Sequence, residues 1–166
     1  MDTLVYEMAT AADAAAIRDL SLLSYREFAA ALEPEHRHAM QQHQTDMHKL
    51  EALMEQAGTF VCRSGERLVG VVFLVPSGQA TTIYPADWSY IRQLGVDPAF
   101  RRMGIGRRLM ELAIEEARRS GEKVLGLHTS TIMPAARKMY DELGFSLIRE
   151  LPPILGQQYW LYKMSL

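Results

Sequence analysis

The fold is decided by residues 90–121, which read YIRQLGVDPAFRRMGIGRRLMELAIEEARRSG. The segment opens with strand-like residues and closes with apolar side chains that return every three or four positions, as on one face of a helix. Between the two patterns, Gly104 and Gly106 allow the backbone to turn sharply and to approach a ligand closely. We therefore expect a strand over residues 89–96 that leads through a glycine turn into a helix over residues 106–120.

This junction predicts a binding site for an anion. The first turn of a helix leaves about four N–H groups without intrahelical partners, and the helix dipole adds roughly half a positive charge there. Backbone amides in this arrangement suit a phosphate or pyrophosphate best. Four arginines flank the turn, and each either adds positive charge to the site or lies solvated on the helix surface: Arg101, Arg102, Arg107 and Arg108.

Two other phosphate-binding loops do not match the sequence. A P-loop requires G-x-x-x-x-G-K followed by Ser or Thr, and the chain has no such lysine and hydroxyl. The dinucleotide fingerprint G-x-G-x-x-G is also absent, because Gly106 is followed by Arg107, Arg108 and Leu109.

The rest of the chain alternates predicted strands and helices, which is typical of an α/β domain built on a mixed sheet. Further strands are expected over residues 3–8, 59–63, 67–75, 123–129, 145–151 and 158–164, with Pro152-Pro153 separating the last two. Further helices are expected over residues 10–28, 34–57 and 134–143, with Gly58 and Gly144 ending the last two. The 166 residues contain no linker, so we expect one domain over residues 1–166.

Composition narrows the class of protein. The formal net charge of −2 argues against a nucleic-acid or membrane-surface partner that binds through bulk charge. The N-terminal residues lack the basic start and apolar run of a secretory signal, and no apolar stretch is long enough for a membrane span. Cys62 is the single cysteine and is expected to be a small buried residue. We expect a soluble, cytoplasmic protein.

The glycine turn belongs to a pair of motifs that resembles a known family. Arg101-x-x-Gly104-x-Gly106 is similar to the Q/R-x-x-G-x-G/A motif of the GNAT superfamily of acyl-CoA-dependent N-acyltransferases. Ala136-x-x-x-Tyr140-x-x-x-Gly144-Phe145 is similar to the A-x-x-x-Y-x-x-x-G-F pattern of the same family. The resemblance is strong over residues 89–145 and extends to the earlier half only through the order of its elements.

The resemblance implies a GNAT fold, a mixed central sheet flanked by helices, and an N-acetyltransferase that uses acetyl-CoA without a metal. It implies that the backbone at Leu94 and Val96 pairs with the pantetheine arm and that amides from Arg102 to Arg107 hold the pyrophosphate. The cofactor-binding residues implied in this way, together with two discussed below, are Leu94, Gly95, Val96, Arg101, Arg102, Met103, Gly104, Ile105, Gly106, Arg107, Ser130 and Met133.

Tyr140 has two possible roles. Its spacing places it on an apolar helical stripe, where a tyrosine is usually part of the core. The resemblance implies instead that Tyr140 is catalytic and protonates the departing CoA thiolate. A thiol has a pKa near 8.5 and a tyrosine about 10, so this transfer is feasible without being strongly driven.

Two positions depart from the family pattern. Many members carry a glutamate base where this chain has Tyr90, so the general base is left open, with Glu33, His36 and His128 as distant candidates. Met133 replaces a frequent asparagine, so its cofactor contact is lost or moves to Thr129, Ser130 or Thr131.

The segment after the first predicted helix is rich in His and Met. His36, His38, His43 and His48 lack Cys or acidic partners at ligand spacing, which favours a polar helix face over a metal site. The seven-residue spacing of Met40, Met47 and Met54 favours a packing stripe, with an adaptable acceptor wall or a dimer seam as alternatives.

The resemblance thus implies an N-acetyltransferase that moves the acetyl group of acetyl-CoA directly to a primary amine in a ternary complex. The acceptor, a small molecule or a peptide or protein amine, would enter beside residues 28–57 and 76–87. The alternative is a non-catalytic acyl-CoA-binding regulatory module with the same fold. The acceptor, the acyl chain and the choice between monomer and homodimer are left open.

Overall fold

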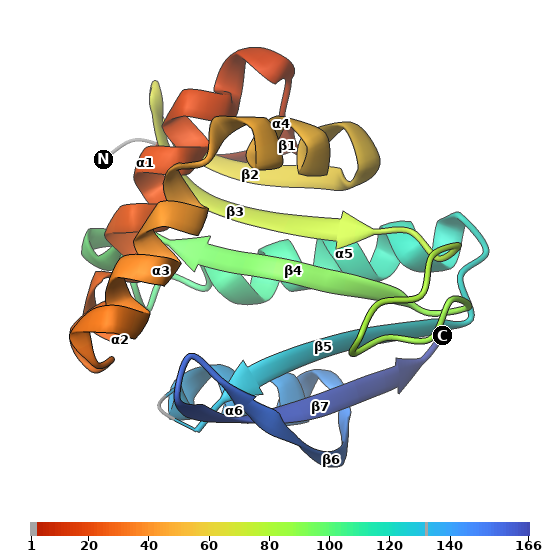
Figure 1. Ribbon diagram of the computed structural model, residues 1–166. Helices are drawn as coiled ribbons and strands as arrows, with labels where there is room; N and C mark the ends of the chain where they lie inside the picture. The colour runs from red at the N-terminus through yellow and green to blue at the C-terminus, as the bar shows by residue number, and fades with distance from the viewer. Residues whose placement is uncertain (1–2, 132) are drawn as a thin grey trace.

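The computed structural model describes residues 3–131 and 133–166, which form a seven-stranded sheet with helices on both faces (Figure 1). The strand order is β1-β2-β3-β4-β5-β7-β6. Only β4 and β5 run parallel, and the other neighbours are antiparallel, which confirms the predicted mixed sheet. The strands are β1 (Leu4–Met8), β2 (Gly58–Ser64), β3 (Arg67–Val75), β4 (Ser89–Val96), β5 (Val124–Ser130), β6 (Ser146–Ile154) and β7 (Gln157–Ser165).

The helices form two layers around this sheet. In Figure 1, α5 and α6 lie behind it, whereas α1, α3 and α4 cover the front. The helices are α1 (Ala14–Ser24), α2 (Arg26–Ala30), α3 (Pro34–Thr45), α4 (Met47–Gln56), α5 (Ile105–Arg119) and α6 (Pro134–Leu143), with 3-10 turns η1 (Ala11–Asp13) and η2 (Pro98–Phe100). No helix in the described part of the chain combines the length and apolar character needed to cross a membrane.

The main core lies between the sheet and α5. The apolar stripe of α5 is buried, and Leu109, Met110 and Ala113 have no exposed surface. Each large apolar side chain buried in this way contributes about 2 kcal/mol to folding. Gly70 on β3 lets the helix approach closely, because a Cβ there would lie 2.7 Å from Cγ2 of Ile105. This packing fixes where α5 begins relative to the sheet.

The sheet opens between its two parallel strands. β4 and β5 pair only at Ser89 with Leu125 and at Tyr90 with Gly126, and beyond these residues the strands diverge (Figure 1). A bulge adds to the divergence, since the β3–β4 register shifts between Val71 and Phe73. Gln93, on the bulged side, has a φ of 52°, which is uncommon for a residue other than glycine. We call the resulting opening between the C-terminal halves of β4 and β5 the wedge.

Two predicted helices are wrong in their extent. The helix expected over residues 10–28 is interrupted at Tyr25, after which α2 begins. The helix expected over residues 34–57 breaks at Asp46, whose carboxylate accepts a hydrogen bond from the Lys49 amide and caps α4. The side chain of an aspartate at an N-cap accepts a hydrogen bond from a backbone amide in the first turn of the helix that follows. A new helix can therefore begin at Asp46 although neither glycine nor proline marks the break.

The end of the chain also differs from the prediction. Gly58 begins β2 instead of only ending a helix, and Pro152 and Pro153 lie inside β6 instead of separating two strands. The prolines are tolerated because β6 is an edge strand and its register shifts between Leu151 and Ile154, where a backbone N–H is not required. The other predicted strands and helices are confirmed to within about two residues.

Candidate active site

A backbone concavity precedes α5. Arg102 and Gly104 both have positive φ values, 66° and 77°, and the chain enters the helix directly afterwards. The first helical bond of α5 runs from the Arg108 amide to the Gly104 carbonyl at 3.0 Å, so earlier amides of the first turn have no partner within the helix. A Cβ at Gly104 would meet no atom within 4 Å. The Gly104 side of this turn therefore faces open space, and we call the concavity the cradle.

The arginine side chains around the cradle are mostly engaged elsewhere. Arg101 pairs with Glu27 on α2 at 3.0 Å, Arg107 pairs with Glu142 on α6, and Arg108 lies 3.7 Å from Glu115. Arg102 and Met103 are exposed. Because exposed ion pairs exchange readily with solvent, these arginines can still turn toward an anion, but the backbone is what shapes the site.

A buried carboxylate anchors the segment between β4 and the cradle. Asp97 is only 3% exposed and forms an ion pair with Arg67 on β3. Its Oδ1 accepts the Ala99 amide at 2.9 Å, and its own amide donates to the Val69 carbonyl at 2.8 Å. Asp97 thereby fixes the direction in which the chain leaves the sheet.

The end of β4 lies directly above the first turn of α5. A Cβ at Gly106 would lie 3.7 Å from side-chain carbons of Leu94 and Val96, an ordinary contact distance, so the helix start packs against the end of the strand. The Leu94 carbonyl accepts a hydrogen bond from the Tyr25 hydroxyl at 2.9 Å. Gly95 faces α1, where a Cβ would lie 2.8 Å from Oγ of Ser24. The N-terminal helices thus hold the bulged end of β4 in place.

The remaining predicted residues lie at the β5 side of the wedge. Ser130 ends β5 with a buried side chain, and Met133 is the N-cap residue of α6. Tyr140 of α6 is buried, with its ring 6.0 Å from that of Phe145 and 6.3 Å from that of Tyr162. Burial raises the pKa of Tyr140, so the phenol keeps its proton at neutral pH. The predicted residues therefore come from both sides of the wedge and from the cradle at its foot.

An aromatic cluster lies where β4 and β5 are still paired. The ring of Tyr90 stacks on that of Tyr84 with centroids 4.2 Å apart, and the Tyr84 hydroxyl lies 2.6 Å from Nδ1 of His128. Burial, with a smaller contribution from the charge of Arg92, lowers the pKa of His128 to about 4. His128 is therefore neutral at physiological pH. We call Tyr84, Tyr90 and His128 the aromatic cluster.

The three candidate bases lie in different surroundings. Glu33 is exposed at the start of α3. His36 packs against the turn between β6 and β7, where a Cβ at Gly156 would lie 2.7 Å from its ring. His128 alone of the three is part of the aromatic cluster. Sequence reasoning did not anticipate Tyr84 as its partner, because the loop before β4 carries no pattern that places a side chain on β5.

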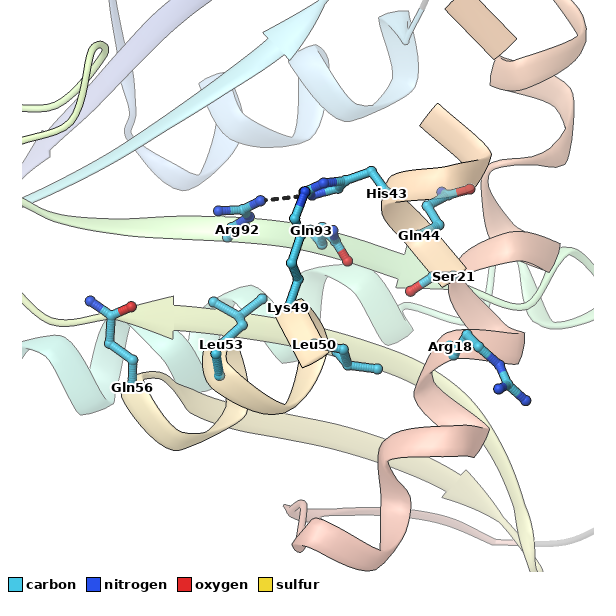
Figure 2. A pocket seen from close by; sticks show the side chains of 11 residues that line it. Arg18, Ser21, His43, Gln44, Lys49, Leu50, Leu53, Gln56, Arg92 and Gln93 are labelled. Atoms are coloured by element: carbon cyan, nitrogen blue, oxygen red, sulfur yellow. Dashed lines mark hydrogen bonds between the residues drawn. The ribbon is translucent and has the colours of Figure 1, made fainter. Parts of the chain in front are cut away.

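A cavity of about 320 Å³ lies beside β4, between α1, α3 and α4 (Figure 2). His43 of α3 and Arg92 of β4 meet across it, with Nη2 of Arg92 3.0 Å from Nε2 of His43. Of the two segments beside which the sequence predicts the acceptor to enter, residues 28–57 contribute to the lining and residues 76–87 do not. Sequence reasoning missed Arg92 as a lining residue, since nothing in the spacing of β4 distinguishes it from a solvated arginine.

The His- and Met-rich segment is divided between two helices. Among residues 3–131 and 133–166, no three His, Cys, Asp or Glu side chains gather as a metal site would require. The break at Asp46 interrupts the methionine stripe, and Met54 packs against the core cluster of Ile17 and Leu20. Cys62 is a buried free thiol.

Comparison with known proteins identifies a family. The Acetyltransferase (GNAT) family matches residues 15–145. An acetyltransferase of Agrobacterium fabrum is 37% identical over 78 residues, 46% of this chain and 56% of that protein. The ribosomal protein bS18 alanine N-acetyltransferase of Escherichia coli is 33% identical over 92 residues, 53% of this chain and 62% of that protein. The chain thus matches little more than half the length of these relatives.

A solved structure shares the fold over the whole chain. The PaiA N-acetyltransferase from Thermoplasma acidophilum, solved in complex with coenzyme A, has a TM-score of 0.81 with 13% identity and 99% coverage of both chains. At this identity the likeness concerns the arrangement of the backbone, and it includes the sheet and both helical layers.

Proposed function

Since the chain belongs to the acetyltransferase (GNAT) family, we propose that it transfers the acetyl group of acetyl-CoA to a primary amine by direct attack in a ternary complex. The observation that carries the proposal is the cradle at Gly104, which opens at the foot of the wedge. A reducing, cytoplasmic setting is part of the proposal, in keeping with the free thiol of Cys62.

The residues that we propose to bind the cofactor lie along the wedge and in the cradle. The backbone of Leu94 and Val96 has no strand partner across the wedge, so it can pair with the pantetheine arm as a strand would. The amides from Arg102 to Arg107 would hold the pyrophosphate. The Leu94 carbonyl can serve although Tyr25 already donates to it, because a carbonyl oxygen has two lone pairs.

Acetyl-CoA supplies the acetyl group as a thioester, so transfer forms one C–N bond and breaks one C–S bond. Tyr140 would donate its phenolic proton to the sulfur that leaves, and the nitrogen would release one proton to His128 or to water, so that protons balance. Because Tyr140 keeps its proton at neutral pH, the donor form is always present. The same raised pKa makes Tyr140 a weak acid that assists the step without being indispensable.

The amine must reach the wedge without its proton. Removing a proton from a lysine-like amine at pH 7 costs about 4.6 kcal/mol, whereas an α-amine costs about 1 kcal/mol. The positive charge of Arg92 and the partly buried position of this residue on β4 favour a neutral amine nearby. These surroundings replace part of what a carboxylate at position 90 would do, where Tyr90 stacks on Tyr84 instead.

The proposal is tested by thiol release from acetyl-CoA in the presence of a broad panel of amines. Acceptor-dependent release, with the acetylated amine identified by mass, is the expected result. The alternative, a regulatory module that binds acyl-CoA without catalysis, is favoured only by Tyr90 and Met133, which depart from the family pattern. That alternative predicts heat on titration with CoA and no turnover with any amine.

A further inference from the structure

The cavity beside β4 has a size suited to a small molecule. Its volume of about 320 Å³ lies at the lower end of the usual range for ligand sites. Leu50 and Leu53 of α4 form an apolar wall, and Gln93 of the β4 bulge lies opposite (Figure 2). The cavity therefore offers both an apolar surface and polar groups to one ligand.

The charge of the cavity has one sign. Its lining contains Arg18, Lys49, Arg92 and His43, and no Asp or Glu is among the lining residues. Arg18 is paired with Asp19 at 3.1 Å, and Figure 2 shows its guanidinium directed away from the other cations. Among the residues that the structure describes, neither Arg92 nor Lys49 forms an ion pair with a carboxylate. Within the described residues, Arg92 and Lys49 thus have no carboxylate at ion-pair distance, although the charge of Asp46 also acts on His43.

Arg92 is held in an orientation that leaves donors available. One of its terminal nitrogens bonds to Nε2 of His43, and the rest of the guanidinium fork can bind a planar oxyanion. Figure 2 shows the Lys49 side chain extending toward the same pair. Burial lowers the pKa of His43, and the charges of Arg92 and Lys49 lower it further, whereas the carboxylate of Asp46, which is not among the lining residues, acts in the opposite direction with a smaller effect.

The cations lie close to the reacting end of the wedge. Arg92 is two residues from Leu94 along β4, about 7 Å at the rise of a strand. Its charge also reaches His128 of the aromatic cluster. A ligand whose anionic group is bound by Arg92 could therefore place its amine in the wedge only if the anionic group and the amine were a few bonds apart.

We propose, on the basis of the function proposed above, that the acceptor is a small amine that also carries an oxyanion, a carboxylate or a phosphate, bound by Arg92 and Lys49. The apolar wall of Leu50 and Leu53 accommodates the remainder of the molecule. Polyamines and amidated peptide ends, which present no such anion, are excluded as good acceptors because they would leave the two cations unpaired or add to their charge.

The test uses acceptors in matched pairs, with thiol release from acetyl-CoA as the readout. The pairs are L-leucine with L-leucinamide and O-phosphoethanolamine with ethanolamine, and spermidine is added as a polycation. In at least one pair, we expect kcat/KM for the compound that carries the oxyanion to exceed that of the compound without it at least tenfold. The pair with the larger ratio shows whether the site prefers a carboxylate or a phosphate. Equal or faster turnover of the compound without the oxyanion in both pairs, or of spermidine, would overturn the proposal.

Variants of Arg92 and Lys49 show whether these two cations cause the preference for an anionic acceptor. Arg92→Gln and Lys49→Met should each raise KM for the anionic acceptor at least tenfold and reduce the preference over its neutral partner. Arg118→Gln, which removes a charge from α5 on the opposite face of the sheet, is the matched control. It should leave unchanged both KM for the anionic acceptor and the preference over its neutral partner. An unaltered preference in Arg92→Gln and Lys49→Met would contradict the assignment.

Calorimetry with CoA separates the two proposals. Turnover of amines that lack an oxyanion, with none of any anionic acceptor, overturns the anionic acceptor and leaves the acetyltransferase function intact. Binding of CoA without turnover of any amine refutes both proposals. Absence of CoA binding refutes the acetyltransferase function itself.

Discussion

Tyr140 shows how burial sets the role of a single side chain. Its ring packs against Phe145 and Tyr162, and its raised pKa follows from the loss of solvent around the phenol. Spacing alone predicted a core residue and the resemblance implied an acid. The observed burial is compatible with both, so the catalytic role of Tyr140 stays a prediction.

Replacing Tyr140 with Phe should lower kcat by roughly ten- to a hundredfold while the dissociation constant for CoA changes little, because the proposed role of the hydroxyl is on the leaving sulfur and the ring packing is retained. Steady-state kinetics and calorimetry measure the two effects. Tyr6→Phe on β1 removes a hydroxyl at the edge of the sheet and serves as the control. If kcat of Tyr140→Phe equals that of the unaltered protein, the acid role is removed.

At the scale of elements, β4 determines the site. Its position, the glycine turn and the start of α5 could be predicted because they depend on local signals, namely strand-forming residues, paired glycines and helical periodicity. The bulge at Gln93 could not, since glutamine rarely adopts a positive φ. It is held by distant contacts, including the Tyr25 hydroxyl on the carbonyl of Leu94, 69 residues away.

Asp97 joins β4 to the cradle, so its removal should weaken both the fold and the site. Asp97→Ala should lower the free energy of unfolding by about 1–3 kcal/mol, because it leaves the part-buried Ala99 amide without its acceptor and removes the buried carboxylate that pairs with Arg67. Urea unfolding measures the loss, and calorimetry should show weaker CoA binding. Asp19→Ala, which breaks an exposed pair, should cost less than about 1 kcal/mol. Equal losses in the two variants would contradict the anchoring role.

For the whole molecule, the site depends on a sheet that separates between β4 and β5. The positions on β4, α5, β5 and α6 that the two motifs single out could be located because both motifs lie in one half of the chain, and their cofactor-binding role stays a prediction. The cavity beside β4 could not be derived in detail, since it forms where α3 and α4 pack on β4 and bring His43 to Arg92, 49 residues away. The break at Asp46, which creates these two helices, has only the weak local signal of a capping residue.

Global stability should depend on pH through His128. Its pKa in the folded protein is about 4, below the ordinary value of 6.5, so the unfolded chain binds a proton more readily between these values. The free energy of unfolding is therefore unaffected by His128 well above pH 6.5, where the ring is neutral in both states. It falls as the pH drops from 6.5 toward 4, because the unfolded chain takes up the proton first. Between pH 7 and pH 5 the loss should be about 2 kcal/mol.

Urea unfolding at the two pH values checks this dependence, with His128→Asn as the comparison. The variant should lose less stability on acidification, although it is less stable at pH 7 because the Tyr84 hydroxyl loses its partner. His38→Asn, at an exposed position on α3, should behave like the unaltered protein. An identical pH dependence in His128→Asn would refute the assignment.

The cradle itself can be closed by one side chain. Gly104→Glu should abolish binding of CoA, because a carboxylate would occupy the space that faces the amides at a backbone φ of 77°. Gly104→Ala adds a methyl group where no atom lies within 4 Å, so it imposes the same backbone strain, about 1 kcal/mol, without the charge. If Gly104→Ala still binds CoA and Gly104→Glu does not, the carboxylate and not the backbone strain is the cause of the lost binding. An unchanged affinity of Gly104→Glu for CoA would count against the cradle.

The most direct measurement is calorimetric titration of the purified protein with CoA and, in parallel, with pantetheine, which lacks the diphosphate and the nucleotide. If the peptide amides ahead of α5 hold the diphosphate, CoA should bind at least a hundredfold more tightly than pantetheine. Equal affinities for the two ligands, or no heat with CoA, would contradict the account.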